Sequence, residues 1–223
     1  MHRRVPGKSE TFGTMTRITV LPLTVLTTIC LIASCSTAQQ LPANGKPLSA
    51  EKKILIVYLS RTNNTKAIAE IIHQKVGGRM VALELETPYP ADYHMTVHQV
   101  VRENDTGYLP PLKTKIEHIE QFDVVFLGFP TWDMQLPPPV KSFLHQYDLK
   151  GKTLIPFNTN GGYGPGGSFE TVRELCPKNT ILKGFTIRGG SERDGEYLAL
   201  KGARAEEARK NVSNWLAEIG MLN

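Results

Sequence analysis

The fold is decided by residues 53–65, which read KILIVYLSRTNNT. The first part, residues 53–59, is an unbroken apolar run rich in branched side chains. Such a run is typical of a strand buried on both faces of a parallel sheet. A polar loop at 60–65 then leads into residues 68–76, where apolar side chains recur at helical spacing. A buried strand that passes through a short loop into an amphipathic helix is the repeating unit of an α/β fold.

The alternation of strands and helices continues to the end of the chain. Apolar runs predict four further strands, at residues 80–85, 123–128, 153–157 and 181–187. Helical spacing predicts helices at residues 93–103, 113–121, 168–175 and 208–219, and another that begins at the prolines 137–139. Five strands alternating with helices predict an α/β fold with a doubly wound, five-stranded parallel sheet and helices on both faces.

Doubly wound sheets hold ligands at the carboxyl ends of their strands, so the loops that follow the strands are the first places to search. The loop after the first strand reads SRTNNT at residues 60–65. Free N–H groups at a helix amino terminus, with short hydroxyl side chains beside them, make a phosphate cradle. The alternative is a simple N-cap, which needs only one such residue. The loop lacks the Gly-x-x-x-x-Gly-Lys-Ser/Thr pattern, which excludes a nucleoside triphosphate loop.

Aromatic and glycine-rich loops follow the third and fourth strands. Residues 128–137 read GFPTWDMQLP, and the flat side chain of Trp132 suits stacking on a planar ring. Packing of Trp132 on the following helix is the alternative. Residues 158–168 read NTNGGYGPGGS, a loop whose backbone N–H groups can approach a flat heterocycle, although glycine content alone also fits a flexible loop. The formal Gly-x-Gly-x-x-Gly match at 162–167 follows the fourth strand and contains Pro165, so we do not interpret it as a dinucleotide site.

Three motifs, in order along the chain, resemble the flavodoxin-like family of bacterial flavin proteins. Residues 57–65 are similar to the family's phosphate loop, Ser/Thr-x-Thr-Gly-Asn-Thr. Residues 128–132 with 139–144, and residues 156–162, resemble its two flavin-ring loops. The resemblance covers residues 53–223. It implies the strand order 2-1-3-4-5 and flavin mononucleotide (FMN) as cofactor.

The resemblance also implies a role for each of twelve residues. The phosphate would be held by the first loop, at Ser60, Thr62, Asn64 and Thr65, with Asn63 in place of the family's Gly. The second loop would flank the isoalloxazine ring with Pro130, Thr131 and Trp132, of which Trp132 would stack. The third would hydrogen-bond the ring edge through Thr159, Asn160, Gly161 and Gly162. Neither a catalytic acid or base nor a metal site is expected.

Two departures from the family pattern bear on the site. Asn63 replaces a glycine, and because Asn tolerates left-handed backbone better than most residues, we expect the turn to survive. Asp133 stands where relatives often carry a second aromatic residue or Gly, and its carboxylate would disfavour an anionic reduced flavin.

The amino-terminal segment is predicted to be an export signal. Residues 1–34 form the expected signal peptide, with Met15 as an alternative start, and the apolar stretch is too short and too polar for a membrane span. The junction at residues 32–35, IASC, resembles the lipobox of bacterial lipoproteins and implies lipidation of Cys35; an ordinary cleaved signal is the alternative. Residues 35–52 are expected to be a flexible tether, and 53–223 the flavodoxin-like domain.

Charge and cysteine content narrow the function. Removing residues 1–34 takes away four of the 26 Lys and Arg and one of the 21 Asp and Glu, so the net charge falls from +5 to +2. The positive net charge of the full chain therefore comes mostly from residues 1–34 and does not indicate a nucleic-acid-binding surface, so no nucleic-acid partner is expected. A near-neutral domain also differs from the strongly acidic carrier flavodoxins. Three cysteines cannot build a disulfide framework, and Cys176 is expected to be a small buried filler.

These features predict an FMN-binding electron-transfer protein or oxidoreductase at the bacterial cell envelope. The protein would be exported and lipid-anchored to the cell membrane or outer membrane, facing the periplasm. Cytosolic nicotinamide would be out of reach, so the expected electron donor is a membrane redox protein or a quinol. Two alternatives stay open: a binding module of the same fold without flavin, and an NAD(P)H-dependent quinone reductase.

Overall fold

The computed structural model describes residues 52–222. The predicted signal peptide, the lipidation site at Cys35 and nearly all of the predicted tether lie outside the described residues. The strands are β1 (Ile54–Tyr58), β2 (Arg79–Ala82), β3 (Val124–Pro130), β4 (Thr153–Asn160), β5 (Thr180–Ile181) and β6 (Phe185–Arg188). The helices are α1 (Asn64–Val76), α2 (Tyr93–Thr106), α3 (Pro138–Gln146), α4 (Ser168–Leu175) and α5 (Ala203–Glu218), with short 3₁₀ turns η2 (Ile119–Gln121) and η3 (Glu192–Asp194).

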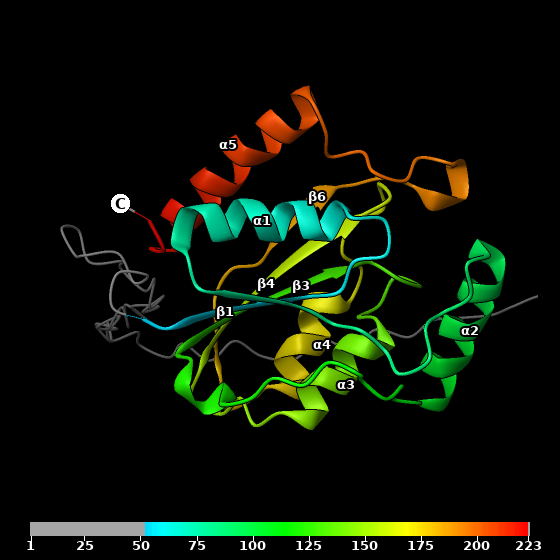
Figure 1. Cartoon of the computed structure of the whole chain (residues 1–223), viewed down its shortest axis with the longest axis horizontal. Helices are drawn as coiled ribbons and strands as arrows, with labels where there is room; N and C mark the ends of the chain where they lie inside the picture. Colours follow the sequence, from blue (N-terminus) through cyan, green and yellow to red (C-terminus); the bar gives the residue numbers. More distant parts are fainter. Residues whose placement is uncertain (1–51, 223) are drawn as a thin grey trace, which may run out of the picture. The chain divides into compact units, whose positions relative to one another are not determined.

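The strands form one parallel sheet in the order β2-β1-β3-β4-β5, with β6 also paired to β4 (Figure 1). This confirms the predicted α/β fold and its strand order. In Figure 1, α1 and α5 lie above the sheet, α3 and α4 lie below it, and α2 stands beside the ends of the strands. Side chains of β1 alternate between the two faces: Ile54, Ile56 and Tyr58 belong to one core cluster, and Leu55 and Val57 to the other.

The predicted fifth strand at 181–187 is two short strands. Residue pairs Leu154–Ile181 and Phe157–Phe185 are in register with β4, but two residues separate them on β4 and three on the partner. The extra residue breaks the ladder at a position where Pro156 of β4 has no N–H to donate. The predicted fifth strand is therefore interrupted and forms two separate segments, β5 and β6.

The predicted helix at 113–121 was wrong except for its last turn, η2. The chain there runs beside the end of β2 instead. The Thr114 hydroxyl donates to the Ala82 carbonyl at 2.9 Å and accepts from the Glu84 N–H at 2.7 Å. Leu112 forms an isolated bridge with Leu85. These bonds satisfy backbone groups that a helix would have used, and they cover the sheet edge.

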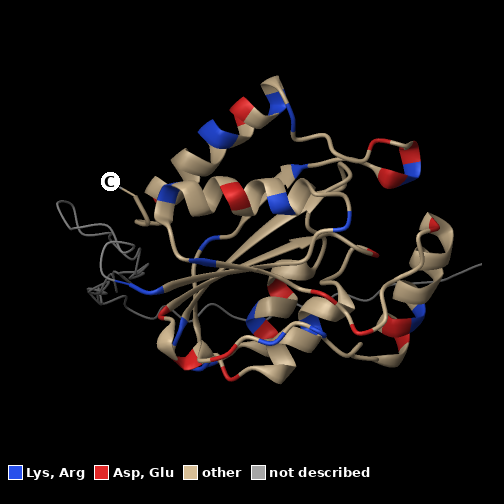
Figure 2. Ribbon diagram, in the orientation of Figure 1, with Lys and Arg blue, Asp and Glu red and all other residues tan. Residues whose placement is uncertain are grey.

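Three further observations concern the surface, the core and the helices. Acidic and basic residues intermix along α1 and α5 (Figure 2). Cys176 is buried among apolar side chains at the end of α4, as expected. Within residues 52–222, no helix combines the length and apolarity that crossing a membrane requires.

Candidate functional site

A cavity of about 320 Å³ opens at the carboxyl ends of β1, β3 and β4. It is lined by all three loops that the sequence singled out, together with α2 and the loop after β6. Nine of the twelve predicted site residues line it: Thr62, Asn64, Thr65, Pro130, Thr131, Trp132, Thr159, Asn160 and Gly161. The other three, Ser60, Asn63 and Gly162, lie in the same loops without lining the cavity.

The loop after β1 delivers the amino terminus of α1 to the cavity. Asn63 has φ 64° and ψ 2°, so it takes the left-handed conformation that the family's glycine would take. The Ser60 hydroxyl accepts the Lys66 N–H at 3.2 Å. The first N–H groups of the helix, at Asn64 and Thr65, have no intrahelical acceptor and carry the positive end of the helix dipole. This end of the cavity is therefore suited to an anion.

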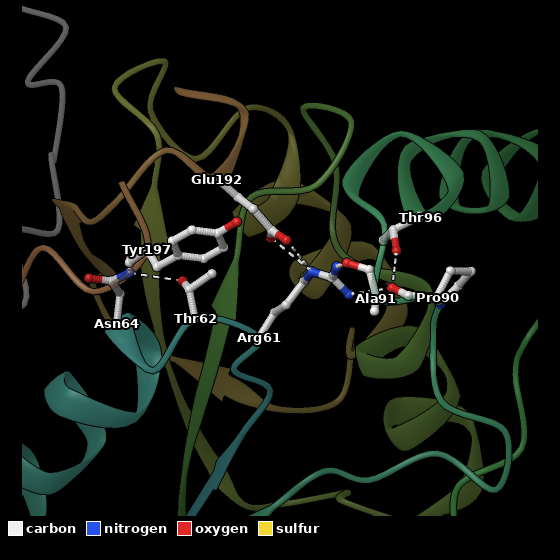
Figure 3. A network of polar contacts seen from close by, with 8 residues as sticks. All are labelled: Arg61, Thr62, Asn64, Pro90, Ala91, Thr96, Glu192 and Tyr197. Carbon is white, nitrogen blue, oxygen red and sulfur yellow. Dashed lines mark hydrogen bonds and ion pairs between the residues drawn. The ribbon is translucent and has the colours of Figure 1, made fainter. Parts of the chain in front are cut away.

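The side chain of Asn64 is hydrogen-bonded within the protein and is not available to a ligand; we call this set of bonds the Asn64 latch. It is 3% exposed, and its Oδ1 accepts the backbone N–H groups of Ala199 at 3.0 Å and Leu200 at 3.2 Å. Its Nδ2 donates to the Thr62 hydroxyl at 2.9 Å and to the Tyr197 carbonyl at 2.5 Å (Figure 3). Asn64 thus fixes the loop between β6 and α5 against the start of α1, and what it offers the cavity is its backbone N–H.

The hydroxyl groups of Thr62 and Thr65 differ in whether they are available to a ligand in the cavity. The Thr65 hydroxyl is buried and pairs with the Thr159 hydroxyl at 2.8 Å, which joins the first and third loops. The Thr62 hydroxyl accepts from Asn64 and keeps its own proton for another acceptor. Of the polar side chains predicted to hold phosphate, Thr62 is therefore the one with donating capacity toward the cavity.

The glycine-rich loop after β4 is ordered by Asn160. The Oδ1 of this 8% exposed side chain accepts the N–H groups of Gly162 at 2.9 Å and Gly164 at 3.1 Å. The N–H of Gly162 is thereby already donated. The Thr131 hydroxyl donates to the Gly164 carbonyl at 2.9 Å and accepts from the buried Asn158 at 3.0 Å. The loop is tied to its neighbours, which argues against a merely flexible segment.

Trp132 opens a tight turn in the loop after β3. The Gln135 N–H donates to the Trp132 carbonyl at 2.9 Å, and the two central residues, Asp133 and Met134, have φ of 51° and 53°. Two positive φ values define a type I′ turn, which glycine and asparagine favour and methionine does not. The Met134 carbonyl accepts the Gly167 N–H at 3.0 Å. The turn orients Trp132, which lines the cavity and also packs against the core under α3.

The carboxylate of Asp133 is connected to a neighbouring cation, Lys141, through the side chain of Asn104. Its carboxylate accepts the Asn104 amide at 3.1 Å, and the Asn104 carbonyl accepts the Lys141 ammonium at 3.0 Å. Burial lowers the pKa of Lys141, and Asp133 opposes that shift. The negative charge that the sequence placed beside the cavity is therefore partly balanced.

Comparison with known proteins agrees with this geometry. A family model described as flavodoxin matches residues 53–197. The chain belongs to the flavodoxin family. The search of curated proteins returned no significant match.

Solved structures of the same fold support the assignment. A candidate flavoprotein from Bacteroides eggerthii is 29% identical, with a TM-score of 0.61 over 75% of this chain and 98% of that one. One from Bacteroides uniformis is 25% identical, with a TM-score of 0.61 over 74% and 98%. A Lactobacillus acidophilus flavoprotein, solved in complex with FMN, is 22% identical, with a TM-score of 0.54 over 65% and 98%.

Sequence reasoning missed two walls of this flavodoxin-family cavity. Helix α2 contributes an apolar wall through Tyr93, Val97 and Val100, and the loop after β6 contributes residues 189–193. The sequence predicted a helix at residues 93–103, but nothing in its spacing indicated that this helix lines a cavity. The loop after β6 carries glycine and charged residues with no pattern that distinguishes a cavity wall from any surface loop.

Arg61 joins both missed walls to the first loop. Its guanidinium donates to the Glu192 carboxylate at 2.8 and 3.0 Å, to the Pro90 carbonyl at 3.0 Å and to the Ala91 carbonyl at 2.8 Å (Figure 3). The Thr96 hydroxyl also donates to the Pro90 carbonyl, at 2.8 Å, which anchors the start of α2. One side chain thus fixes three segments that are far apart in the sequence.

Proposed function

We propose that the protein binds FMN in this cavity and transfers electrons through it. The observation that carries the proposal is the division of one cavity into a polar and an apolar end. The polar end presents the amino terminus of α1 and the Thr62 hydroxyl, and the apolar end presents Trp132, Val97 and Val100. FMN has the same division, with a phosphate at one end and a flat ring at the other.

The fit is also one of size and donor chemistry. A cavity of about 320 Å³ is at the lower end of the range for small-molecule sites, so it holds one ligand. Charge-assisted hydrogen bonds from backbone N–H groups at a helix start can hold a phosphate without lysine. The FMN-bound Lactobacillus flavoprotein, which shares this fold, makes FMN the first ligand to test.

Each wall would contribute a different part of the binding. The N–H groups of Asn64 and Thr65 and the Thr62 hydroxyl would hold the phosphate, and Trp132 would stack on the ring. The remaining N–H and carbonyl groups of the glycine-rich loop would meet the ring edge. Bound FMN would supply the electron-transfer chemistry, and the protein would set binding, water exclusion and nearby charge.

We further propose that the protein works at the cell envelope, anchored by lipid on Cys35. Support comes from the sequence at residues 18–35, an apolar stretch that ends in Ile-Ala-Ser-Cys. The domain would then receive electrons from a membrane redox protein or a quinol. Mass spectrometry of the mature amino terminus tests this: a diacylglyceryl group on Cys35 is expected. A soluble mature chain that begins elsewhere would contradict it.

An absorbance spectrum of the purified full chain tests the flavin proposal. We expect a yellow protein with flavin absorbance, or a colourless one that becomes yellow on adding FMN, followed by bleaching with a quinol or a membrane redox protein. A colourless protein that takes up no FMN would favour a binding module without flavin. Turnover with NAD(P)H and a quinone would favour a quinone reductase.

A further inference from the structure

The ring of Trp132 touches an aromatic residue that is not among those lining the cavity. The rings of Trp132 and Tyr89 meet edge to face, with centroids 5.2 Å apart and planes at 86°. Tyr89 lies in the connection between β2 and α2. A side chain that faces the cavity is therefore in van der Waals contact with a half-buried phenol behind it.

The Tyr89 phenol donates to a buried carboxylate. Its hydroxyl hydrogen bonds Oε2 of Glu103, and the Gln99 amide donates to Oε1 at 2.8 Å. Glu103 is 6% exposed, and within residues 52–222 no Lys, Arg or His pairs with it. Both oxygens act as acceptors, which is the pattern of an ionised carboxylate. The Tyr89 phenol proton therefore already points at a carboxylate oxygen that can receive it.

We propose that Tyr89 and Glu103 form a relay that restores Trp132 after one-electron oxidation. A small inorganic radical that enters the cavity removes one electron from the Trp132 indole. Tyr89 returns that electron, and its phenol proton passes from Oη to Oε2 of Glu103. The products are intact Trp132, a neutral Tyr89 phenoxyl radical and a protonated Glu103. The relay needs no bound cofactor, so it can be tested independently of the flavin proposal.

The chemistry requires this arrangement because an oxidised phenol is a strong acid and loses its proton as the electron leaves. A base already hydrogen-bonded to the phenol removes the need for solvent to collect that proton. In the resting protein the proton stays on the phenol, since burial and the Glu103 carboxylate raise the pKa of Tyr89. The proton moves only when the electron does.

The other tryptophan of the chain provides an internal comparison. Trp215 contacts Phe126 and Phe185, at ring-centroid distances of 6.1 and 5.1 Å, and its indole N–H donates to the Lys183 carbonyl. No tyrosine ring is among these contacts. An oxidised Trp215 would therefore lack the partner that Trp132 has.

Pulse radiolysis of the full chain tests the relay, with azide radicals as the oxidant of tryptophan. In a Trp215→Phe variant, Trp132 is the sole tryptophan, and its radical absorbance should give way to a tyrosine phenoxyl signal in a first-order step whose rate does not depend on protein concentration. Tyr89→Phe should abolish that step. Glu103→Gln, which keeps a hydrogen-bonding side chain without the base, should slow it. Tyr197→Phe, at a tyrosine that is 60% exposed and does not line the cavity, should leave it unchanged.

The result that would overturn the relay is a first-order step that survives in Tyr89→Phe, or one of equal rate in the Trp132→Phe protein, where only Trp215 can be oxidised. If Tyr89→Phe does not fold, the relay is tested in the Trp215→Phe protein alone, by the solvent isotope effect on the rate of the first-order step. Exchange into D₂O should slow the step because a proton moves with the electron. An unchanged rate would contradict the transfer to Glu103.

Discussion

The two ends of the cavity use side chains in opposite ways. At the polar end, the side chains of Asn64 and Thr65 are buried and hydrogen-bonded to other parts of the protein, and the backbone is left to face the cavity. At the apolar end, the side chains of Trp132 and Met134 themselves line the space. Substitutions at the polar end should therefore act through loop order, and substitutions at the aromatic end through loss of ligand contact.

Among substitutions that remove a side-chain interaction, the largest expected effect is at the polar end. Asn64→Ala leaves the buried N–H groups of Ala199 and Leu200 without acceptors, and we expect it to lower the free energy of unfolding by about 2–3 kcal/mol. Chemical denaturation measures the change. The matched control is the neighbouring Asn63→Gly, because glycine accepts its left-handed backbone and no side-chain bond is lost. Equal stability of the two variants would mean that the Asn64 latch does not stabilise the protein.

At the aromatic end, Trp132→Ala should weaken FMN binding by about 1–2 kcal/mol through loss of ring contact and buried area. It should also increase the fluorescence of bound flavin, since a stacked indole quenches it. Titration with FMN measures both. Tyr163→Ala is the control, because Tyr163 also lines the cavity but is 70% exposed. If Tyr163→Ala has the larger effect, Tyr163 stacks on the ring and Trp132 is a core anchor.

A third effect tests the strained turn that orients Trp132. Met134→Gly should stabilise the protein by about 1 kcal/mol, because glycine has no penalty at φ 53°. On the other side of the same contact, Gly166→Ala should be strongly destabilising, since a Cβ there would lie 2.0 Å from the Met134 carbonyl oxygen. Thermal denaturation of both variants distinguishes the outcomes. A loss of stability in Met134→Gly would show that the side chain, rather than the turn, is what matters.

The smallest effect concerns charge beside the ring. Asp133→Asn should raise the reduction potential of bound FMN, since a negative charge disfavours the reduced ring, and should leave affinity for oxidised FMN nearly unchanged. Lys141→Met, at the other end of the Asn104 bridge, should lower the potential. Redox titration measures both. Shifts of the same sign would show that Asp133 and Lys141 do not act through their charges.

The sheet was predictable because burial on both faces leaves a plain signal in the sequence. Runs such as residues 54–59 and 124–129 are apolar throughout, and their alternation with helical segments predicts a doubly wound parallel sheet. The strand order itself was implied by the resemblance to the flavodoxin-like family. The helix expected at 113–121 failed because its apolar spacing serves an edge-covering segment held by Thr114. The spacing of apolar residues along a short segment does not reveal which distant segment its backbone and side chains will hydrogen-bond.

The site was predictable in position but not in detail. Hydroxyl and amide residues in the loops after β1 and β4 correctly indicated where the cavity lies. Residue type could not tell that Asn64 and Asn160 direct their amides at other backbone segments, because those partners are distant in sequence. The type I′ turn at Asp133 and Met134 was missed for a related reason, since neither residue is the asparagine or glycine that such turns favour.

The central claim is that backbone N–H groups at the start of α1, with the Thr62 hydroxyl, bind a phosphate. The most direct test compares the affinity of the full chain for FMN with its affinity for riboflavin, which lacks the phosphate, by fluorescence titration. Two hydrogen bonds to a charged group, at about 1.5–3 kcal/mol each, predict that FMN binds at least about a hundredfold more tightly. Thr62→Ala should narrow that ratio by weakening FMN alone. Equal affinities for FMN and riboflavin would contradict the account.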